Sequence, residues 1–112
     1  MNEQTAHAKA LVAMVVRAFY DDPCIVVVDF LLRVPFLRDG PGMGRQLHLS
    51  TKQLRRTLAF LQHEHLVDLE SVTAMVETVA ATRTYRRPKT AHFWYIDLNR
   101  AFHSMRLKLH LM

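Results

Sequence analysis

The sequence is poor in cysteine, because Cys24 is the single one among 112 residues. One thiol supports neither an internal disulfide nor a cysteine-based zinc site, which favours a reducing compartment. No apolar run approaches the roughly 20 residues that a membrane-spanning helix needs, and no apolar segment follows a basic N-terminal region as in a signal peptide. We therefore expect a soluble protein that is not exported and does not bind a membrane.

Glycine is also scarce, and the three glycines all lie between Asp39 and Gly44. This segment predicts a loop, but it lacks the Gly-Lys-Ser/Thr ending of a phosphate-binding P-loop. The sequence has no glycine-flanked serine elbow, and the apolar surroundings of Cys24 are expected to raise the pKa of its thiol. His63 and His65 lack the i,i+4 spacing that places two imidazoles on one helix face. We expect neither an enzyme nor a site for a metal or cofactor.

Acidic residues are scarce in the last third of the chain. Residues 1–78 hold eight Lys and Arg against nine Asp and Glu, whereas residues 79–112 hold seven against one. The formal net charge of +5 therefore originates in the expected hairpin and last helix. Such a local excess is suited to phosphates or to an acidic protein surface.

Two helices are predicted in the first third of the chain. Residues 6–20 place their apolar side chains on one broad arc, as an amphipathic helix does. The Asp-Asp-Pro sequence at residues 21–23 is a start signal for a second helix over residues 24–34, which Pro35 ends. The β-branched run at residues 25–28 is also typical of a buried strand, so propensity leaves that alternative open.

After the glycine-rich loop, residues 45–49 predict a short helix with core residues Met43, Leu47 and Leu49 nearby. Ser50 or Thr51 caps a longer helix that begins near residue 52. One side of this helix is apolar and is expected in the core: Leu54, Thr57, Leu58 and Leu61. The other side carries positive charge and no acid: Lys52, Arg55, Arg56, Ala59 and His63. This strip is suited to a DNA groove, or it is an ordinary solvated helix face.

A long β-hairpin is predicted after Leu66, with its second strand over residues 91–98. Residues 72–79 are compatible with either an additional strand or a short helix. The strongest basic cluster is placed at the hairpin tip and contains Arg83, Arg86, Arg87 and Lys89, with Tyr85 among them. Arg and Lys neutralise phosphates and tyrosine stacks on unpaired bases, so we predict nucleic-acid binding there, with a solvated loop tip as the alternative.

A last helix is predicted with Asn99 as its N-cap. Three of its apolar residues are expected to pack inward: Phe102, Met105 and Leu109. Leu107 and Leu111 then point outward and form a candidate surface for a protein partner.

The predicted elements define an α+β fold in one domain over residues 1–112. Helices followed by a hairpin are typical of a winged helix-turn-helix, here extended by a long β-hairpin wing and a C-terminal helix. We expect the first helix and the Ser50 helix to share the core through five residues: Val15, Phe19, Leu54, Leu58 and Leu61.

Three stretches carry a family pattern in this order: LVAMVVRAFYDDPCIVVVDFLLR at residues 11–33, STKQLRRTLAFLQHEHLVD at residues 50–68 and HFWYIDLNRAFHSMRLKLHLM at residues 92–112. In combination they resemble the N-terminal extended winged-helix domain of the alpha subunit of general transcription factor IIE (TFIIE), and its archaeal counterpart, transcription factor E. The family continues into a four-cysteine zinc ribbon that this sequence lacks, so a truncated or divergent member is expected. Residues 71–91 are also longer than the expected wing.

The resemblance implies a scaffold role in the nucleus. The domain is expected to sit on the RNA polymerase II clamp near the upstream edge of the transcription bubble, to pair with the TFIIE beta subunit, to help promoter opening and to recruit factor IIH. Promoter DNA is expected to be bound weakly and without sequence specificity, so the face of Lys52, Arg55 and Arg56 meets either protein or phosphates. The alternative is a stand-alone winged-helix DNA-binding regulator, which needs base-reading side chains beside the arginines. Gln53 disfavours that alternative because it lies off the strip by about 100°, the angle of one residue.

Overall fold

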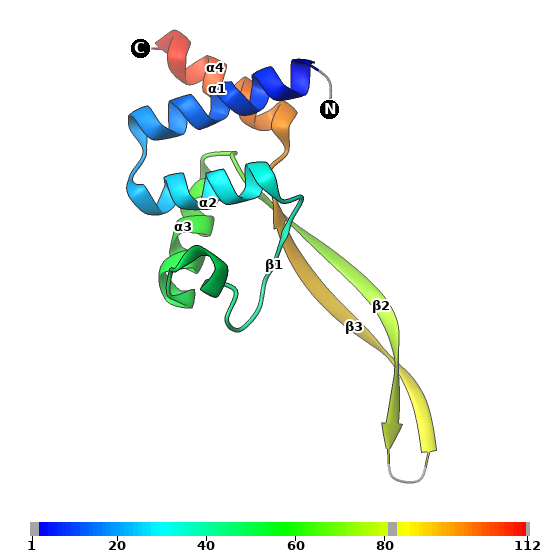
Figure 1. Ribbon diagram of the computed structural model, residues 1–112. Helices are drawn as coiled ribbons and strands as arrows, with labels where there is room; N and C mark the ends of the chain where they lie inside the picture. Colours follow the sequence, from blue (N-terminus) through cyan, green and yellow to red (C-terminus); the bar gives the residue numbers. More distant parts are fainter. Residues whose placement is uncertain (1–2, 81–82, 112) are drawn as a thin grey trace.

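A computed structural model describes residues 3–80 and 83–111, apart from the side chains of residues 4, 78, 80 and 108–111. The elements follow one another as α1 (Glu3–Phe19), α2 (Asp22–Arg33), β1 (Leu37–Arg38), the 3-10 helix η1 (Arg45–Leu47), α3 (Thr51–His63), β2 (Asp68–Ala80), β3 (Arg83–Tyr95) and α4 (Leu98–Leu111). The helices form a body, and β2 and β3 extend from it as a long arm (Figure 1). The predicted α+β fold, a winged helix with a C-terminal helix, is confirmed.

Local signals set the start and the end of α2. The Asp21 carboxylate accepts a hydrogen bond at 3.3 Å from the backbone N–H three residues further on, and Pro23 occupies the first turn. Pro35 follows the helix end, where an extended residue must precede it. The β-branched middle is helical because Val27 and Val28 are fully buried, so core packing outweighs strand propensity.

The glycine-rich loop is held close to the start of α3. The carbonyl oxygen of Gly44 accepts hydrogen bonds from the backbone N–H groups of Leu47 and Leu49, each at 3.1 Å. A side chain at Gly44 would collide with the carbonyl oxygen of Leu49, so only glycine fits. The short helix predicted over residues 45–49 is η1, and Met43 and Leu47 are buried as predicted.

β1 is a strand that the sequence does not predict. It pairs antiparallel with β3, Leu37 opposite Trp94 and Arg38 opposite Phe93, and it completes a sheet of order β1-β3-β2. Two residues are too few to show an alternating pattern, so this strand follows from its tertiary contact alone.

β2 and β3 pair antiparallel without interruption from Asp68 opposite Tyr95 to Ala80 opposite Arg83. Residues 72–79 are therefore strand, not helix. The basic cluster is predicted at the hairpin tip, with a solvated loop tip as the alternative. The loop is wrong, because Arg83 to Lys89 lie within β3. The arm gives the molecule a long axis of 64 Å against 30 and 22 Å in the other directions (Figure 1).

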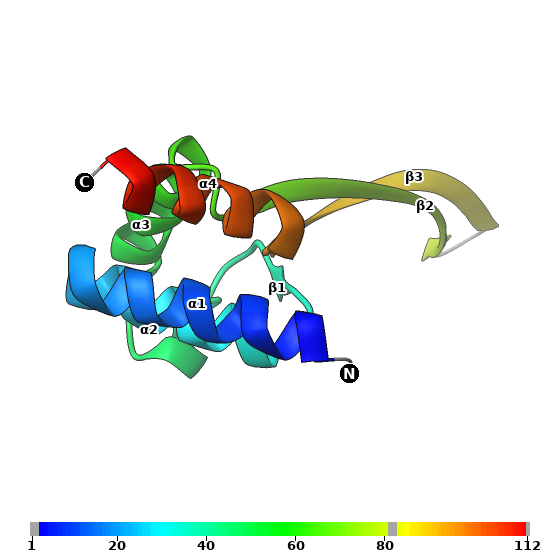
Figure 2. The ribbon, with the colours of Figure 1, turned by 90° about the horizontal axis from the view of Figure 1, so that it is seen from above.

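The four described helices enclose one core, in which α1 packs on α2 and α4, and α2 packs on α3 (Figure 2). The predicted core residues Val15, Leu54, Leu58 and Leu61 are buried. The prediction for Phe19 is wrong, because 52% of this residue is exposed. α1 ends there and the chain turns, so Tyr20 packs on α3 instead, with its ring 6.1 Å from that of Phe60.

The start of α4 differs from the prediction. β3 ends at Tyr95, and Asp97 is the N-cap: its carboxylate accepts hydrogen bonds from the backbone N–H groups of Asn99 and Arg100 at 3.1 and 3.3 Å. Asn99 is therefore inside the helix rather than at its cap. Met105 is fully buried and Phe102 is half-buried, as predicted, whereas the side chain of Leu109 lies outside the described residues.

Candidate nucleic-acid interface

The strand pairing divides the arm into two faces. Successive side chains of a strand point to opposite faces, and residues directly opposite each other on antiparallel strands share a face. The cationic face is defined here by Arg83, Tyr85, Arg87 and Lys89 of β3. The neutral face carries Arg86 of β3, with Glu77 of β2 directly opposite it.

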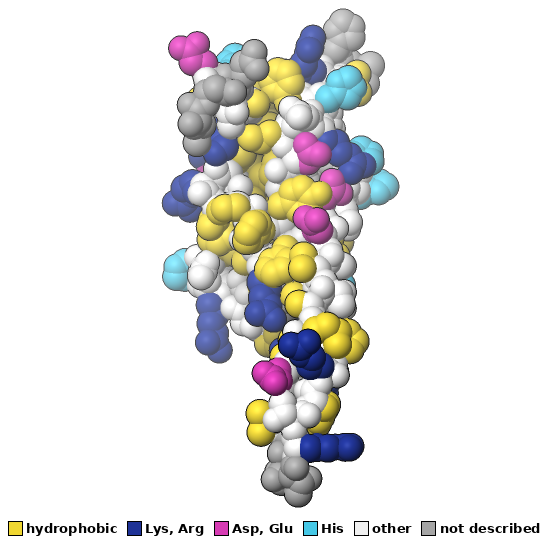
Figure 3. Space-filling view, turned by 90° about the vertical axis from the view of Figure 1, so that its right-hand side faces the viewer, with side chains coloured by type: hydrophobic (Ala, Val, Ile, Leu, Met, Phe, Trp, Pro, Cys, Tyr) yellow, Lys and Arg dark blue, Asp and Glu magenta, His cyan; other side chains and the backbone are white. Residues whose placement is uncertain are grey.

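The cationic face has no acid among the residues that oppose its cations. Arg87 is opposite Val76, Lys89 is opposite Ala74, and Arg83 is opposite residue 80, an alanine. All three cations are exposed, and no carboxylate among the described residues forms an ion pair with them. Figure 3 shows Lys and Arg side chains spaced down the arm among hydrophobic ones. Unpaired cations at strand spacing, with Tyr85 half-exposed among them, are suited to a row of phosphates.

Arg86 belongs to a different surface from the other three cations of the predicted cluster. It shares the neutral face with Glu77, and an opposite charge at a cross-strand position offsets its field. The sequence analysis treats the four cations alike because the side chains of a loop have no alternating faces. Once the stretch is recognised as a strand, the alternation alone separates Arg86 from Arg87.

Arg38 is a candidate that the sequence analysis missed. It is exposed and lies opposite Phe93, which is on the same face of β3 as Lys89, so it extends the cationic face towards the body. Phe93 also meets Phe36 edge to face, with ring centroids 5.5 Å apart. Glu70 of β2 lies opposite Phe93 and is therefore an acid on the same face. Detecting Arg38 requires β1, whose two residues give no pattern in the sequence.

The basic strip of α3 is exposed as predicted, but its charges are not all free. Arg55 forms an ion pair with Asp39, with 3.3 Å between Nη1 and Oδ1. The same carboxylate accepts a hydrogen bond at 3.3 Å from the indole N–H of Trp94 in β3. Lys52 and Arg56 have no ion-pair partner among the described residues, so they are the available cations of this strip.

The predicted partner surface on α4 is reduced to one described leucine. Leu107 is 51% exposed, whereas the side chain of Leu111 lies outside the described residues. Leu107 borders a shallow hollow with His65 and Arg100. Arg100 binds both carboxylate oxygens of Asp68, at 2.9 and 3.1 Å, and therefore fixes α4 to the base of the arm.

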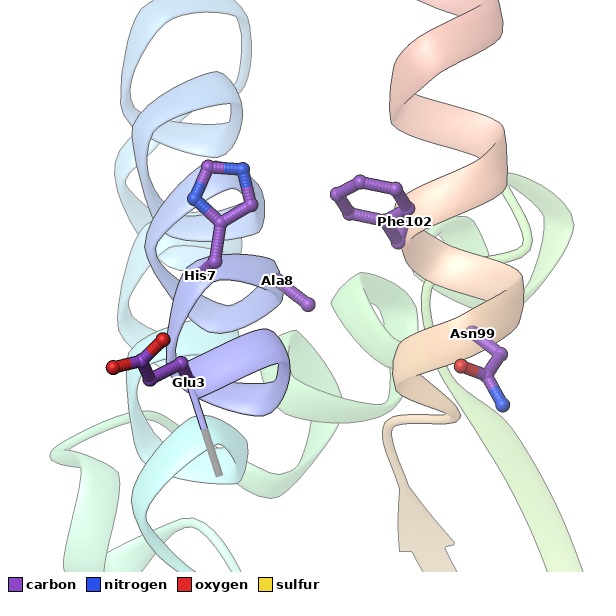
Figure 4. A pocket seen from close by; sticks show the side chains of 5 residues that line it. All are labelled: Glu3, His7, Ala8, Asn99 and Phe102. Atoms are coloured by element: carbon purple, nitrogen blue, oxygen red, sulfur yellow. The ribbon is translucent and has the colours of Figure 1, made fainter. Parts of the chain in front are cut away.

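A groove of about 650 Å³ lies between α1 and α4. It is lined by Glu3, His7 and Ala8 of α1 and by Asn99 and Phe102 of α4 (Figure 4). The imidazole ring of His7 and the ring of Phe102 face each other across it with centroids 6.4 Å apart. Its polar side chains are exposed, so the groove lacks the buried, convergent polar groups of a catalytic pocket.

Cys24 is buried away from every surface considered above. Burial raises the pKa of its thiol to about 12, and a hydrogen bond to Asp21 adds to the increase. The thiol therefore stays protonated near neutral pH and is a poor nucleophile.

Among the described residues, no group of His, Cys, Asp and Glu is arranged to hold a metal ion, and no helix is long and apolar enough to cross a membrane.

These features define a class of protein: a winged-helix domain with an elongated, one-sided basic wing and an additional C-terminal helix. Over 101 residues the chain is 31% identical to General transcription factor IIE subunit 1 of Dictyostelium discoideum, a match that covers 90% of this chain and 21% of that protein. No family model matches the sequence. The chain belongs to this family and is a TFIIE alpha-like domain. It spans 21% of the length of the relative.

Proposed function

We propose that the chain is a non-enzymatic domain of a general transcription initiation factor that works in the nucleus. The observation that carries this proposal is the 31% identity to a TFIIE subunit over nearly the whole chain. In this role the domain docks on the RNA polymerase II clamp beside promoter DNA. It pairs with the TFIIE beta subunit, supports promoter opening and helps to recruit factor IIH.

In this proposal, the arm supplies the contact with promoter DNA. No carboxylate lies directly opposite Arg83, Arg87 or Lys89 in the strand pairing, so they are available to neutralise phosphates. Phosphate contacts position a protein without reading sequence. Binding to bare DNA is therefore weak, nearly independent of sequence and steeply dependent on salt.

The body supplies the protein contacts in this proposal. Leu107 is an exposed apolar residue on α4, and the strip on α3 keeps two available cations, Lys52 and Arg56. Arg55 is already paired with Asp39, and Gln53 lies off the strip, about 100° from Lys52. A strip of this kind lacks the aligned Asn or Gln amide that reads adenine.

Recovery of partners from nuclear extract tests the docking role. The full chain, immobilised through one terminus, should retain RNA polymerase II and the TFIIE beta subunit, as identified by mass spectrometry. Leu107→Glu is expected to weaken retention of a protein that binds α4, and Met14→Glu on α1 provides a control with an exposed apolar residue elsewhere. A chain that retains neither protein, yet binds duplexes with a base preference, would instead be a stand-alone regulator.

A fluorescence titration with a bubble-containing duplex tests the DNA contact. Arg87→Glu should reduce affinity by about tenfold and lower the slope of affinity against salt concentration, because it replaces one phosphate contact by a repulsion. Arg86→Glu is the matched control, since the neighbouring side chain lies on the neutral face opposite Glu77, and its effect should be several-fold smaller. Equal losses in both variants would show that the two faces of the arm are not distinguished by DNA. A greater loss in Lys52→Glu than in Arg87→Glu would place the contact on α3.

A further inference from the structure

A pocket lies at the junction of the body and the arm, where α2 ends and β1 begins. Its volume is about 340 Å³, within the range of about 300–1,000 Å³ that is usual for small-ligand sites. Its walls come from the end of α2, from β1, and from the glycine-rich loop and η1 that follow. The residues that give this β1 pocket its chemistry are Phe30, Phe36, Arg38, Met43 and Gln46.

The β1 pocket combines apolar walls with two polar groups. Met43 is buried and Phe30 is half-buried, whereas 57% of Phe36 is exposed. Arg38 and Gln46 are exposed and supply a guanidinium and an amide, and no carboxylate is among the described residues that line the pocket. An amide both donates and accepts hydrogen bonds. The pocket therefore suits a flat, uncharged ring that carries donors and acceptors on its edge and is attached to an anion.

Phe36 connects the β1 pocket to the cationic face of the arm. Its ring meets that of Phe93 edge to face, with centroids 5.5 Å apart. Phe93 lies on the same face of β3 as Arg87 and Lys89, because these positions differ by even numbers. An exposed aromatic ring that is supported by a second ring is a platform on which another flat ring can stack.

Arg38 connects the pocket to the row of cations. It has no ion pair among the described residues and lies opposite Phe93, and Lys89 follows four residues along β3, at a distance of about 13 Å. The carboxylate of Asp39 is already bound by an ion pair to α3 and by a hydrogen bond from β3. Glu70 flanks Phe93 on the β2 side, so its charge repels a polyanion towards the β1 side, where Arg38 lies. Phosphates on the arm are therefore directed to the β1 pocket.

We propose that the β1 pocket binds one unpaired base of a DNA strand whose phosphates follow the cationic face. The base stacks on Phe36, the amide of Gln46 binds the edge of the base, and Arg38 binds the adjoining phosphate. Every base has a face that can stack, so this contact tolerates any sequence. A base inside a duplex is stacked and paired, and it enters a pocket only after it leaves the helix. The inference rests on the proposed contact between the arm and promoter DNA, and it adds a preference for unpaired over paired DNA.

Titrations with two matched DNA probes test this preference. The full chain is titrated with a bubble-containing duplex and with a fully paired duplex of the same length. The bubble should be bound about tenfold more tightly, which is the effect of one stacked base. A 2-aminopurine placed in the bubble reports the contact directly, because its fluorescence falls when it stacks on an aromatic ring.

Variants of Phe36 assign the preference to the pocket. Phe36→Ala should lower affinity for the bubble by about tenfold and leave affinity for the paired duplex unchanged, whereas Phe36→Tyr keeps the ring and should retain the preference and the quenching. Phe60→Ala is the matched control. Phe60 is 48% exposed and also meets an aromatic ring edge to face, but it lies on α3 and does not line the pocket. Circular dichroism of each variant verifies that the chain is folded.

The results separate this inference from the proposed function. Equal affinity of the unmodified chain for both probes would overturn the base pocket, while a loss of both affinities in Arg87→Glu would still support the phosphate contact. An unchanged bubble preference in Phe36→Ala, or the same loss in Phe60→Ala, would also overturn the pocket. Binding to neither probe would overturn the pocket together with the DNA contact of the arm. If Phe36→Ala instead loses a protein from nuclear extract and keeps its bubble affinity, a protein segment occupies the pocket and the inference is wrong.

Discussion

The body and the arm are built on different principles. In the body, apolar side chains from all four α-helices meet in one core, and the starts of α2, α3 and α4 are capped by Asp21, Ser50 and Asp97. In the arm, residues 69 to 77 are exposed throughout, and the backbone pairing of two strands supplies the order. Stability therefore resides in the body, whereas the arm exposes nearly every side chain to a partner.

The largest effect is expected from a cavity in the body. Leu58→Ala removes a fully buried side chain of α3 and should lower the free energy of unfolding by about 2–5 kcal/mol. Urea denaturation followed by circular dichroism measures the change. A loss below about 0.5 kcal/mol is typical of surface positions and would contradict the assignment of Leu58 to the core.

A second loss of stability is expected in the glycine-rich loop, where Gly44 has no room for a side chain. Gly44→Ala places a methyl group against the carbonyl oxygen of Leu49, and should cost about 1–3 kcal/mol. Gly40→Ala is the matched control, since nothing lies within 4 Å of the added methyl group. Thermal unfolding of both variants should separate them, and equal stability would show that the loop gives way freely.

Alkaline pH should weaken the body through Cys24. Its pKa is raised from 9.0 to about 12 in the folded state, so this contribution to stability is complete below pH 9 and is lost as pH rises towards 12. The loss amounts to about 1.4 kcal/mol per pH unit within this window. Urea midpoints between pH 8 and pH 10 should fall less steeply for Cys24→Ala, and parallel curves would contradict a protonated buried thiol.

The smallest effect is expected from shortening the arm. Residues 74–89 can be removed as complete cross-strand pairs and replaced by an Asn-Gly turn, which closes a two-residue hairpin. Because these residues do not contribute to the core, the free energy of unfolding of the body should change by no more than about 0.5 kcal/mol. A loss of several times that amount, measured by urea denaturation at concentrations that keep the chain monomeric, would show that the arm supports the helices.

Sequence reasoning is accurate where the determinants are local. The Ser50 cap, the Asp-Pro start of α2 and the apolar side of α3 each depend on residues within a few positions, and the structure confirms all three. The family resemblance is confirmed by the relative as well. These signals place the helices and the hairpin in their correct order.

The errors concern tertiary context. Asp97 and Asn99 are equally good caps by residue type, and only the end of β3 at Tyr95 decides between them. Phe19 fits the apolar arc of α1. Because the chain turns into α2 after this residue, Tyr20 contacts α3 in its place. The division of the basic cluster between two faces requires that the strands extend as far as Ala80 and Arg83, and the sequence leaves this length open. Local patterns therefore predict which elements form, whereas side-chain placement at their ends depends on neighbours.

The carboxylate of Asp39 also determines how the molecule transmits force. β3 is continuous from the far end of the arm to Trp94, whose indole N–H binds Asp39, and Asp39 in turn holds Arg55 of α3. A force on the far end of the arm would reach α3 through this carboxylate, and it would reach α4 through the contact of Arg100 with Asp68. The basic surfaces of the arm and of α3 are therefore coupled through Asp39, by a partly exposed ion pair of a kind that contributes about 0–1 kcal/mol.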